Sequence, residues 1–231
     1  MTFSVQWPSA ASALPTVDEL HLWRINLDEN PGNREILSPD EQERAQRFVF
    51  EEHRKRFIAA RSWLRQTLGA YLQTPPEQIA FVVAERGKPA VVEKLNPNRL
   101  CFNLSHSAQQ ALLAVTLRHE VGVDIQDIQA SKKWQEIAER WFTAAEWNHV
   151  RQLPEAAQSR ALTEIWTRKE AVGKALGEGL STRVFSFAVG VADWGAVDCG
   201  EGVSVWSLPA FENFAAAVAV QKSSSPQLPV K

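Results

Sequence analysis

Cysteine is scarce in this sequence. The 231 residues include only two cysteines, Cys101 and Cys199, whose spacing fits no metal-binding or redox motif. Such usage suits a reducing compartment, so we expect a cytoplasmic protein with two inert thiols.

Long apolar runs are missing as well. The longest, such as residues 214–220, are far too short to span a membrane. The first twenty residues contain no Lys or Arg and no extended apolar stretch. We therefore expect no secretory signal and no membrane partner.

Neither sign of charge is in clear excess. Lys and Arg number 25 against 27 Asp and Glu, which gives a formal net charge of −2. The chain lacks the basic surplus typical of nucleic-acid-binding proteins, so we expect no nucleic-acid partner and only local anion sites. Hydrophobic residues, in contrast, make up 45% of the chain, enough to bury one large core or two smaller ones.

The periodicity of the apolar residues predicts an α+β protein. Strand patterns occur at residues 20–27, 79–84, 102–104, 111–117 and 121–128, and again at 184–191, 203–208 and 214–220. Helical spacing predicts two helices within residues 41–72, capped by Ser38 or Asp40, and further helices after residue 129. The order β, helices, β-β-β thus occurs twice.

We therefore expect two similar lobes related by a pseudo-two-fold axis, each a small, mostly antiparallel sheet packed with helices. Residues 1–119 would form the N-terminal lobe and residues 120–220 the C-terminal lobe. The Pro- and Ser-rich residues 221–231 would form a flexible tail.

An acid interrupts the apolar strand predicted at residues 121–128. Strand alternation places Gly122, Asp124 and Gln126 on one face and Asp127 on the other. A carboxylate in such a strand must be hydrogen-bonded, protonated or bound to a cation. Asp124 is thus a candidate metal ligand, with a turn cap or an arginine pair as the alternative.

The helix predicted within residues 165–180 carries a second acid. Trp166, Glu170 and Lys174 recur every four residues along one face. The Glu170 and Lys174 spacing also suits a simple surface ion pair, so that interpretation stays open. If Glu170 meets Asp124, the two carboxylates would suit Mg²⁺, which takes one or two carboxylates together with waters and phosphate oxygens.

Three further features suit anion binding. Between Arg44 and Arg65 lie seven basic and two acidic residues, which describe either a solvated helix face or an anion site. The segment "FNLSHS" at residues 102–107 offers hydroxyls and an imidazole, and no G-x-S-x-G motif supports a catalytic triad there. The turn "RGKP" at residues 86–89 presents Lys88 without a Walker A pattern.

Taken together and in this order, these segments resemble the phosphopantetheinyl transferase superfamily, in particular its Sfp-like group of single-chain, two-lobed enzymes. Six segments within residues 37–180 carry the resemblance. They are "LSPDEQERAQRF" (37–48), "GKP" (87–89), "FNLSHS" (102–107), "VGVDI" (121–125), "RWFTAAEW" (140–147) and "WTRKEAVGKALGEGL" (166–180).

The resemblance implies the 4′-phosphopantetheinyl transferase fold and a Mg²⁺-dependent holo-acyl-carrier-protein synthase. Such an enzyme transfers 4′-phosphopantetheine from coenzyme A to a serine of apo acyl, peptidyl or polyketide carrier proteins and releases adenosine 3′,5′-bisphosphate. Single-chain members are expected to be monomers.

The resemblance also assigns residues by position. Asp124 and Glu170 match the Mg²⁺ ligands, Glu170 matches the proposed general base, and Lys174 matches the lysine near the pyrophosphate; these three are the candidate catalytic residues. The candidate coenzyme A residues are Arg44, Gly87, Lys88, Pro89, Asn103, Ser105, His106 and Lys174.

Gln126 departs from the pattern. Many bacterial members have Glu two places after the metal-binding Asp, and other members, including animal ones, lack it. An amide is a poorer Mg²⁺ ligand, so we expect Gln126 to reach the metal through a water, with metal affinity affected more than activity.

Two other functions are compatible with parts of this pattern. A non-enzymatic carrier-binding module would bind coenzyme A without forming product, but the presence of Asp124, Glu170 and Lys174 argues against it. A metal-dependent phosphohydrolase would release products without a protein acceptor, but the sequence lacks a dense His/Asp cluster.

Overall fold

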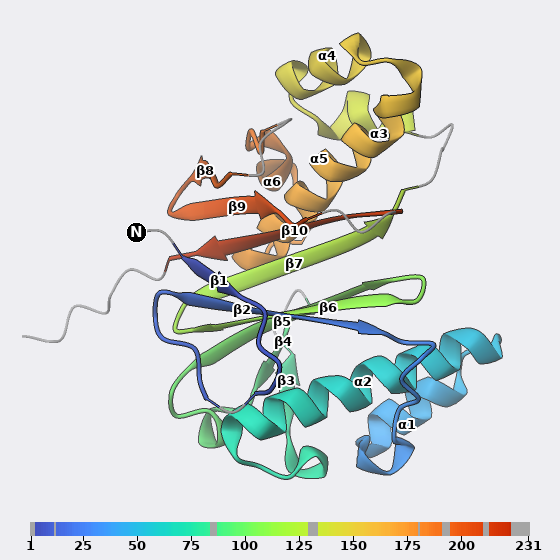
Figure 1. Cartoon of the computed structure of the whole chain (residues 1–231), viewed down its shortest axis with the longest axis vertical. Coiled ribbons are helices and arrows are strands. Elements are labelled where there is room, and N and C mark those ends of the chain that lie inside the picture. The colour runs from blue at the N-terminus through green and yellow to red at the C-terminus, as the bar shows by residue number, and fades with distance from the viewer. Residues whose placement is uncertain are drawn as a thin grey trace, which may run out of the picture.

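The computed structural model describes residues 3–11, 13–83, 87–128, 134–179, 181–190, 195–209 and 213–222 (Figure 1). Up to residue 117 the elements are β1 (Ser4–Gln6), β2 (Glu19–Asn26), η1 (Arg34–Ile36), α1 (Pro39–Gln46), α2 (Glu51–Leu72), η2 (Pro76–Gln78), β3 (Phe81–Val83), β4 (Pro89–Val91), η3 (Glu93–Leu95), β5 (Leu100–Ser107) and β6 (Gln110–Leu117). After it come β7 (Glu120–Asp127), α3 (Trp134–Trp141), α4 (Ala144–Gln152), α5 (Glu155–Leu176), α6 (Thr182–Ser186), β8 (Val197–Gly200), β9 (Val203–Ser207) and β10 (Phe214–Gln221).

Two four-stranded sheets lie between two long helices. The strand order is β1-β2-β6-β5 in the first sheet and β7-β10-β9-β8 in the second, and β3 and β4 form a separate hairpin. Within the described pairings only β1 and β2 run parallel. Figure 1 shows the resulting layers in the order α2, first sheet, second sheet, α5. The expected α+β class with antiparallel sheets packed against helices is confirmed, whereas the pseudo-two-fold axis remains a prediction.

Strand alternation determines which residues fill each layer. The core between the sheets is built by apolar residues of β2 and β6 on one side and of β7 and β10 on the other. Its members include Leu20, Leu22, Leu112, Ala114, Val121, Val123, Val218 and Val220. Alternate residues of β6, Leu113 and Val115, face away from this core and pack with Leu64 and Leu68 of α2.

The helical region at residues 41–72 is two helices, as expected. Ser38 caps α1 and forms a capping box with Glu41, which satisfies backbone donors at the start of the helix. The helix α2 begins after Phe50, whose backbone is extended, and ends at Gln73 in the left-handed conformation.

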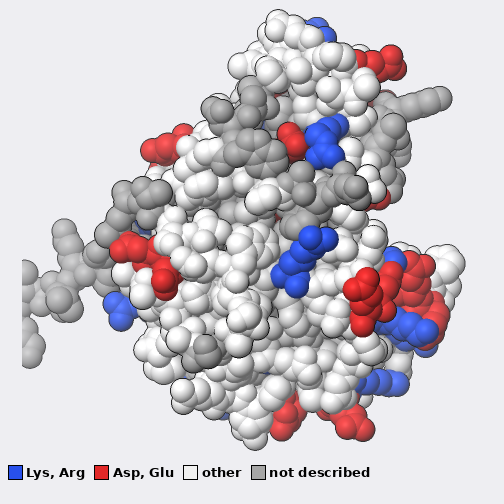
Figure 2. Space-filling model, in the orientation of Figure 1, with Lys and Arg blue, Asp and Glu red and all other residues white. Residues whose placement is uncertain are grey.

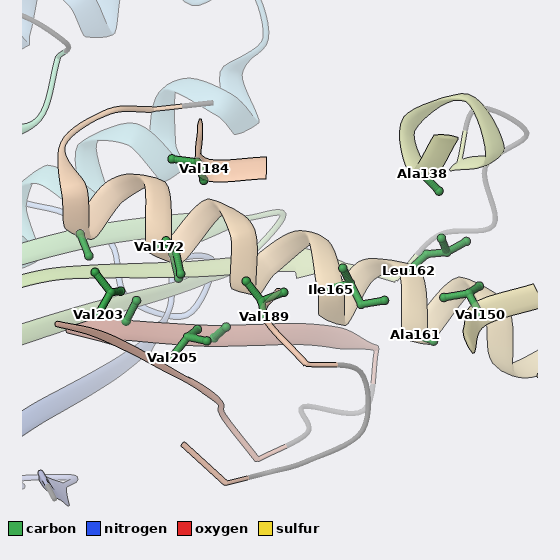
Figure 3. Packing of buried hydrophobic residues seen from close by; sticks show 14 residues of the cluster. Ala138, Val150, Ala161, Leu162, Ile165, Val172, Val184, Val189, Val203 and Val205 are labelled. Atoms are coloured by element: carbon green, nitrogen blue, oxygen red, sulfur yellow. The ribbon is translucent and has the colours of Figure 1, made fainter. Parts of the chain in front are cut away.

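Small residues bring α5 close to the second sheet. A side chain at Gly122 of β7 would lie 2.1 Å from the carbonyl oxygen of Ala171 and 2.4 Å from the amide nitrogen of Ala175. Along the rest of the helix, Ile165 and Val172 belong to one buried cluster with Val203 and Val205 of β9 (Figure 3). The helix therefore rests almost directly on β7, where Asp124 lies.

The prediction of a strand at residues 184–191 is wrong. Residues 184–186 belong to α6, residues 187–190 form no strand, and residue 191 lies outside the described part. The carbonyl oxygens of Phe185 and Phe187 accept hydrogen bonds from Lys169, and that of Val189 accepts one from Arg168. Buried side chains of α5 thus satisfy backbone groups that a neighbouring strand would otherwise bind.

Other expectations need smaller corrections. The strand expected at residues 102–104 extends over the whole of β5, and the one expected at 79–84 begins only at Phe81. The flexible tail expected at residues 221–231 lies outside the described residues from 223 onward. No helix in the described part of the chain is long and apolar enough to cross a membrane.

Candidate active site

Asp124 is the centre of a small polar cluster between β5, β7 and α5. Its side chain is buried, with 6% of the residue exposed. Its Oδ1 atom accepts a hydrogen bond of 2.8 Å from the Ser105 hydroxyl and one of 2.6 Å from the Lys174 ammonium group. Lys174 also donates to Ser105 Oγ and to the Val123 carbonyl oxygen, each at 3.1 Å. The predicted site residues Ser105, Asp124 and Lys174 are therefore in direct contact.

The cluster forms because the edges of the two sheets meet at β5 and β7. The Asn103 side-chain oxygen accepts a hydrogen bond from the Val123 amide, and the Ser107 hydroxyl accepts one from the Asp127 amide. Polar side chains of β5 thus satisfy the exposed edge of β7, which would otherwise be open to pairing with another strand. The same alternation turns Ser105 toward Asp124.

Glu170 lies one helical turn before Lys174, and its burial and the charge of Asp124 raise its pKa. Burial and the neighbouring Asp124 carboxylate raise the pKa of Glu170 from 4.5 to about 7, although Lys174 opposes the shift. Two carboxylates that repel each other in a partly desolvated site are a typical arrangement at catalytic centres. The predicted pair of Asp124 and Glu170 is therefore brought together, with Lys174 beside both.

These side chains suit a hard divalent cation. Two carboxylates are within the number that Mg²⁺ takes from a protein, and a cation between them would relieve the repulsion that raises the pKa of Glu170. Gln126, on the same face of β7, is exposed. Among the described residues no group of three or more His, Cys, Asp or Glu forms a metal cluster, so water or substrate oxygens would have to complete the coordination.

A cavity of about 240 Å³ adjoins this cluster. Its lining includes five of the predicted coenzyme A residues, namely Gly87, Lys88, Pro89, Asn103 and Lys174, together with Gly173, Gly177 and Gly179. Gly87 has a φ of +88° and Gly177 ends α5 with a φ of +65°, conformations that favour glycine. A side chain at Gly173 would lie 2.6 Å from the Gly179 carbonyl oxygen, so close backbone approach explains that glycine.

Glu120 is a residue of this region that the sequence did not indicate. Its Oε2 atom accepts a 2.6 Å ion-pair hydrogen bond from Lys88, so the hairpin turn is tied to the first residue of β7. Lys88 and Glu120 also line a larger neighbouring cavity of about 740 Å³.

Both cysteines have raised pKa values, about 12 for Cys101 and about 11 for Cys199, chiefly because of burial, so both are protonated at neutral pH.

His106 and Arg44 extend the site on the other side of Ser105. The pKa of His106 is lowered by desolvation and then by the positive charges of Lys174, Arg44 and Arg56. These cations therefore lie near the imidazole, including Arg56, which the motif comparison did not select. A group of positive charges around His106 suits a phosphate.

Most of the basic excess between Arg44 and Arg65 does not form a free anion site. Five of the seven cations pair with carboxylates: Arg47 with Glu43, Arg54 with Glu51, Arg56 with Asp28 and Glu52, and Arg61 and Arg65 with Glu41. Arg44 instead lies over the Phe57 ring, 5.3 Å from its centre. Figure 2 likewise shows basic and acidic residues in small neighbouring groups on one face.

Comparisons with known proteins match both halves of the chain. The profile of the 4′-phosphopantetheinyl transferase superfamily matches residues 120–219, and that of the 4′-phosphopantetheinyl transferase N-terminal region matches residues 21–118. The 4′-phosphopantetheinyl transferase HetI of Nostoc sp. is 40% identical over 168 residues, or 71% of each chain. The 4′-phosphopantetheinyl transferase Sfp of Bacillus subtilis is 27% identical over 165 residues, again 71% of each chain.

A third relative matches a shorter part of the chain. The L-aminoadipate-semialdehyde dehydrogenase-phosphopantetheinyl transferase of Xenopus laevis is 32% identical over 152 residues, which are 62% of this chain and 50% of the relative.

Proposed function

The chain belongs to the 4′-phosphopantetheinyl transferase superfamily, and we propose that it transfers 4′-phosphopantetheine from coenzyme A to a carrier-protein serine at the Asp124 cluster. The observation that carries this assignment is the 2.6 Å contact between Asp124 of β7 and Lys174 of α5, with Glu170 one turn away. This arrangement offers carboxylates for a cation and an ammonium group for phosphate at one place.

The reaction is a phosphoryl displacement. The serine oxygen bonds to the phosphorus that carries the pantetheine arm, and the bond from this phosphorus to the oxygen of the leaving adenosine 3′,5′-bisphosphate breaks. The proton of the serine hydroxyl must pass to a base. Glu170 is our candidate, because it matches the base of the family and lies beside Asp124 in the cluster. A bound Mg²⁺ would lower its pKa and make it a weak base, so holding the serine and the pyrophosphate close together would supply much of the rate.

The cations have separate roles. Lys174 neutralises the pyrophosphate next to Asp124, and Lys88 reaches the same cavity from the hairpin. Arg44 and His106 hold a phosphate at the other end, where the positive charge of Arg44 helps to lower the pKa of His106 and so lies near it. Gly87, Pro89, Asn103 and Ser105 shape the walls between them.

Asp124 and Glu170 would hold Mg²⁺, with Gln126 acting through a water. When bound, Mg²⁺ would withdraw charge from the pyrophosphate and orient it for displacement.

We further propose that the enzyme is a cytoplasmic monomer with lobes at residues 1–119 and 120–220. The two separate profile matches support the two lobes. The monomer is supported by the site, because β5, β7 and α5 of one chain supply its residues. The acceptors are apo acyl, peptidyl or polyketide carrier proteins.

The test measures the phosphopantetheine adduct on apo carrier proteins by intact mass, with coenzyme A and Mg²⁺ present. We expect the wild type to modify a carrier, and Asp124→Asn and Glu170→Gln each to lose about 100-fold in rate. A chelator should abolish transfer and added Mg²⁺ should restore it. The control is Glu164→Gln, on the same helix and outside the cluster.

No adduct on any carrier would contradict the proposal. Adenosine bisphosphate formed without an adduct would indicate a phosphohydrolase, and coenzyme A binding with neither product would indicate a binding module. Wild-type rates in Glu170→Gln would exclude Glu170 as the base.

A further inference from the structure

Glu41 is a buried carboxylate at the start of α1 that the proposed reaction does not use. Only 6% of the residue is exposed. Its Oε2 atom accepts a 3.0 Å hydrogen bond from the Ser38 amide and a 2.6 Å bond from Arg65 Nε. Its Oε1 atom accepts a 2.6 Å bond from Arg61 Nε. One carboxylate therefore binds its own helix cap and two arginines of α2.

The two arginines continue the contacts toward the β3–β4 hairpin. Arg65 NH1 donates to the carbonyl oxygens of Pro76 and Ile79, at 3.1 and 2.8 Å. The guanidinium groups of Arg61 and Arg65 lie 4.9 and 5.3 Å from the centre of the Phe81 ring, the first residue of β3. These contacts fix the base of the hairpin through its backbone and through cation–π attraction.

The hairpin turn and α1 carry Lys88 and Arg44, two of the cations assigned to coenzyme A. In the hairpin register Phe81 pairs with Val91 and Val83 pairs with Pro89. Lys88 directly precedes Pro89, the first residue of β4, so the position of β3 constrains where Lys88 lies. On α1, Arg44 follows Glu41 by three residues and therefore lies one turn along the same helix.

We infer that Glu41, acting through Arg61, Arg65 and Phe81, is a positioning residue that holds Arg44 and Lys88 at the spacing coenzyme A requires. This inference rests on the proposed function, because it takes these two cations as coenzyme A ligands. Glu41 itself touches neither the cavity lining nor the Asp124 cluster in the contacts described above.

The network is charged, which suits this role. Burial by itself would raise the pKa of Glu41, but Arg61, Arg65 and the Ser38 amide together hold it below 4.5. A buried carboxylate with two arginines is directional, since Arg presents a rigid planar fork. Removing the negative charge would leave two arginines without their shared partner, and both could then shift relative to Phe81.

The central experiment compares Glu41→Gln with Glu43→Gln. Glu43 is on the same helix, but its side chain is 66% exposed and pairs with the exposed Arg47. In steady-state transfer assays well below the melting temperature, we expect Glu41→Gln to raise KM for coenzyme A about tenfold with kcat within about twofold of wild type. Glu43→Gln should leave both constants unchanged.

This split separates positioning from a merely structural role. A variant that only unfolds more easily loses active molecules, which lowers apparent kcat and leaves KM for coenzyme A unchanged. An unchanged KM in folded Glu41→Gln would therefore overturn the inference. Titration calorimetry with coenzyme A should show the same weakening as KM.

A second variant keeps the test decisive if Glu41→Gln does not fold. Phe81→Leu retains an apolar side chain but removes the ring beneath the two guanidinium groups. We expect it to raise KM for coenzyme A severalfold with little change in kcat, and an unchanged KM would contradict the inference.

Direct substitutions distinguish failure of the inference from failure of the proposed function. Arg44→Met and Lys88→Met should each raise KM for coenzyme A. If they do and Glu41→Gln does not, only the positioning role fails. If neither raises KM, the coenzyme A assignment fails, and the role of Glu41 fails with it.

Discussion

The long helices of the two halves, α2 and α5, are both 22 residues long but pack on their sheets differently. Large side chains fill the layer beneath α2, where Leu64 and Leu68 meet Leu113 and Val115 of β6. Beneath α5, Val172 packs in one cluster with Val203 and Val205. Over β7, however, the layer is thin, because Gly122 lies against the helix backbone at Ala171 and Ala175.

The difference explains why the candidate chemistry lies in the second half. A short Asp side chain on a strand can contact a lysine of the covering helix only if the two backbones approach closely. Gly122, two residues before Asp124, permits that approach. The bulkier layer beneath α2 contributes stability through buried apolar side chains.

The two halves nevertheless share one feature, a buried ion pair between a helix cap and the long helix. In each, the Glu of a capping box is buried and binds a buried cation of the long helix: Glu41 binds Arg65, and Glu146 binds Lys169 at 2.9 Å. Each cation also donates to carbonyl oxygens of the segment that follows the helix. The first pair uses the planar guanidinium group of Arg65 and the second the compact ammonium group of Lys169. Lys169 directly precedes Glu170 in the sequence.

The largest effect should follow from breaking the second pair. Lys169 is fully buried. Lys169→Met would remove the cation that pairs with the buried Glu146 and the donor to the carbonyl oxygens of Phe185 and Phe187. We expect a loss of about 3–5 kcal/mol in the free energy of unfolding, measured by urea denaturation.

The matched control is Arg160→Met on the same helix. Arg160 pairs with Glu164 at 3.8 Å, and the side chains are 41% and 29% exposed. A pair of this kind is worth at most about 1 kcal/mol. Equal losses in the two variants would mean that the buried pair contributes no special stability.

The two helix layers can be tested by opposite substitutions. Leu64→Ala would create a cavity beneath α2 and cost about 2–5 kcal/mol with kcat unchanged in the folded protein. Gly122→Ala would force α5 away from β7 and cost about 1–3 kcal/mol. Because it moves Lys174 and Glu170 away from Asp124, it should also lower kcat more than tenfold.

Both variants are measured by urea denaturation and by the carrier-modification assay. If Leu64→Ala lowers kcat as much as Gly122→Ala does, the packing of α5 on β7 affects catalysis no more than the packing of α2 does, and the contrast between the two layers is wrong.

Periodic patterns gave the parts of the fold that depend on local sequence. The two helices at residues 41–72, the strands β2, β6, β7, β9 and β10, and the face shared by Gly122 and Asp124 follow from spacings of 3.6 and 2 residues. The short edge strands β1 and β8 were not predicted. The length of β5 was underestimated because its polar residues look like a strand end. Asn103, Ser105 and Ser107 in fact bind β7, a contact made only after the two sheets meet.

Long-range pairing accounts for what the sequence could not predict. Residues 184–191 alternate like a strand, but Lys169 and Arg168 bind their carbonyl oxygens from α5, and no local signal marks that outcome. The pairing of Lys88 with Glu120 likewise depends on a turn meeting the first residue of a strand 32 positions away. Motif spacing identified which side chains could react, and the fold determined which neighbours hold them.

The titration of Glu170 should differ in sign from that of Glu41. Because the pKa of Glu170 is about 7 in the folded protein against 4.5 ordinarily, the native state binds a proton that the unfolded state has lost between these values. Stability from this group should therefore fall as pH rises from about 4.5 to about 7. The lowered pKa of Glu41 has the opposite sign, so its contribution is lost only as pH falls below 4.5.

Urea midpoints at pH 5 and pH 8, measured with a chelator present, isolate the contribution of Glu170. The wild type should lose more stability between these values than Glu170→Gln does, whereas Glu155→Gln, an exposed change at the start of the same helix, should behave as wild type. Glu41 is ionised at both pH values and cancels from the difference. If the stability of the wild type and of Glu170→Gln changes equally with pH, the pKa of Glu170 is not raised in the folded protein. The close approach of α5 to β7 would then have no effect on the ionisation of Glu170.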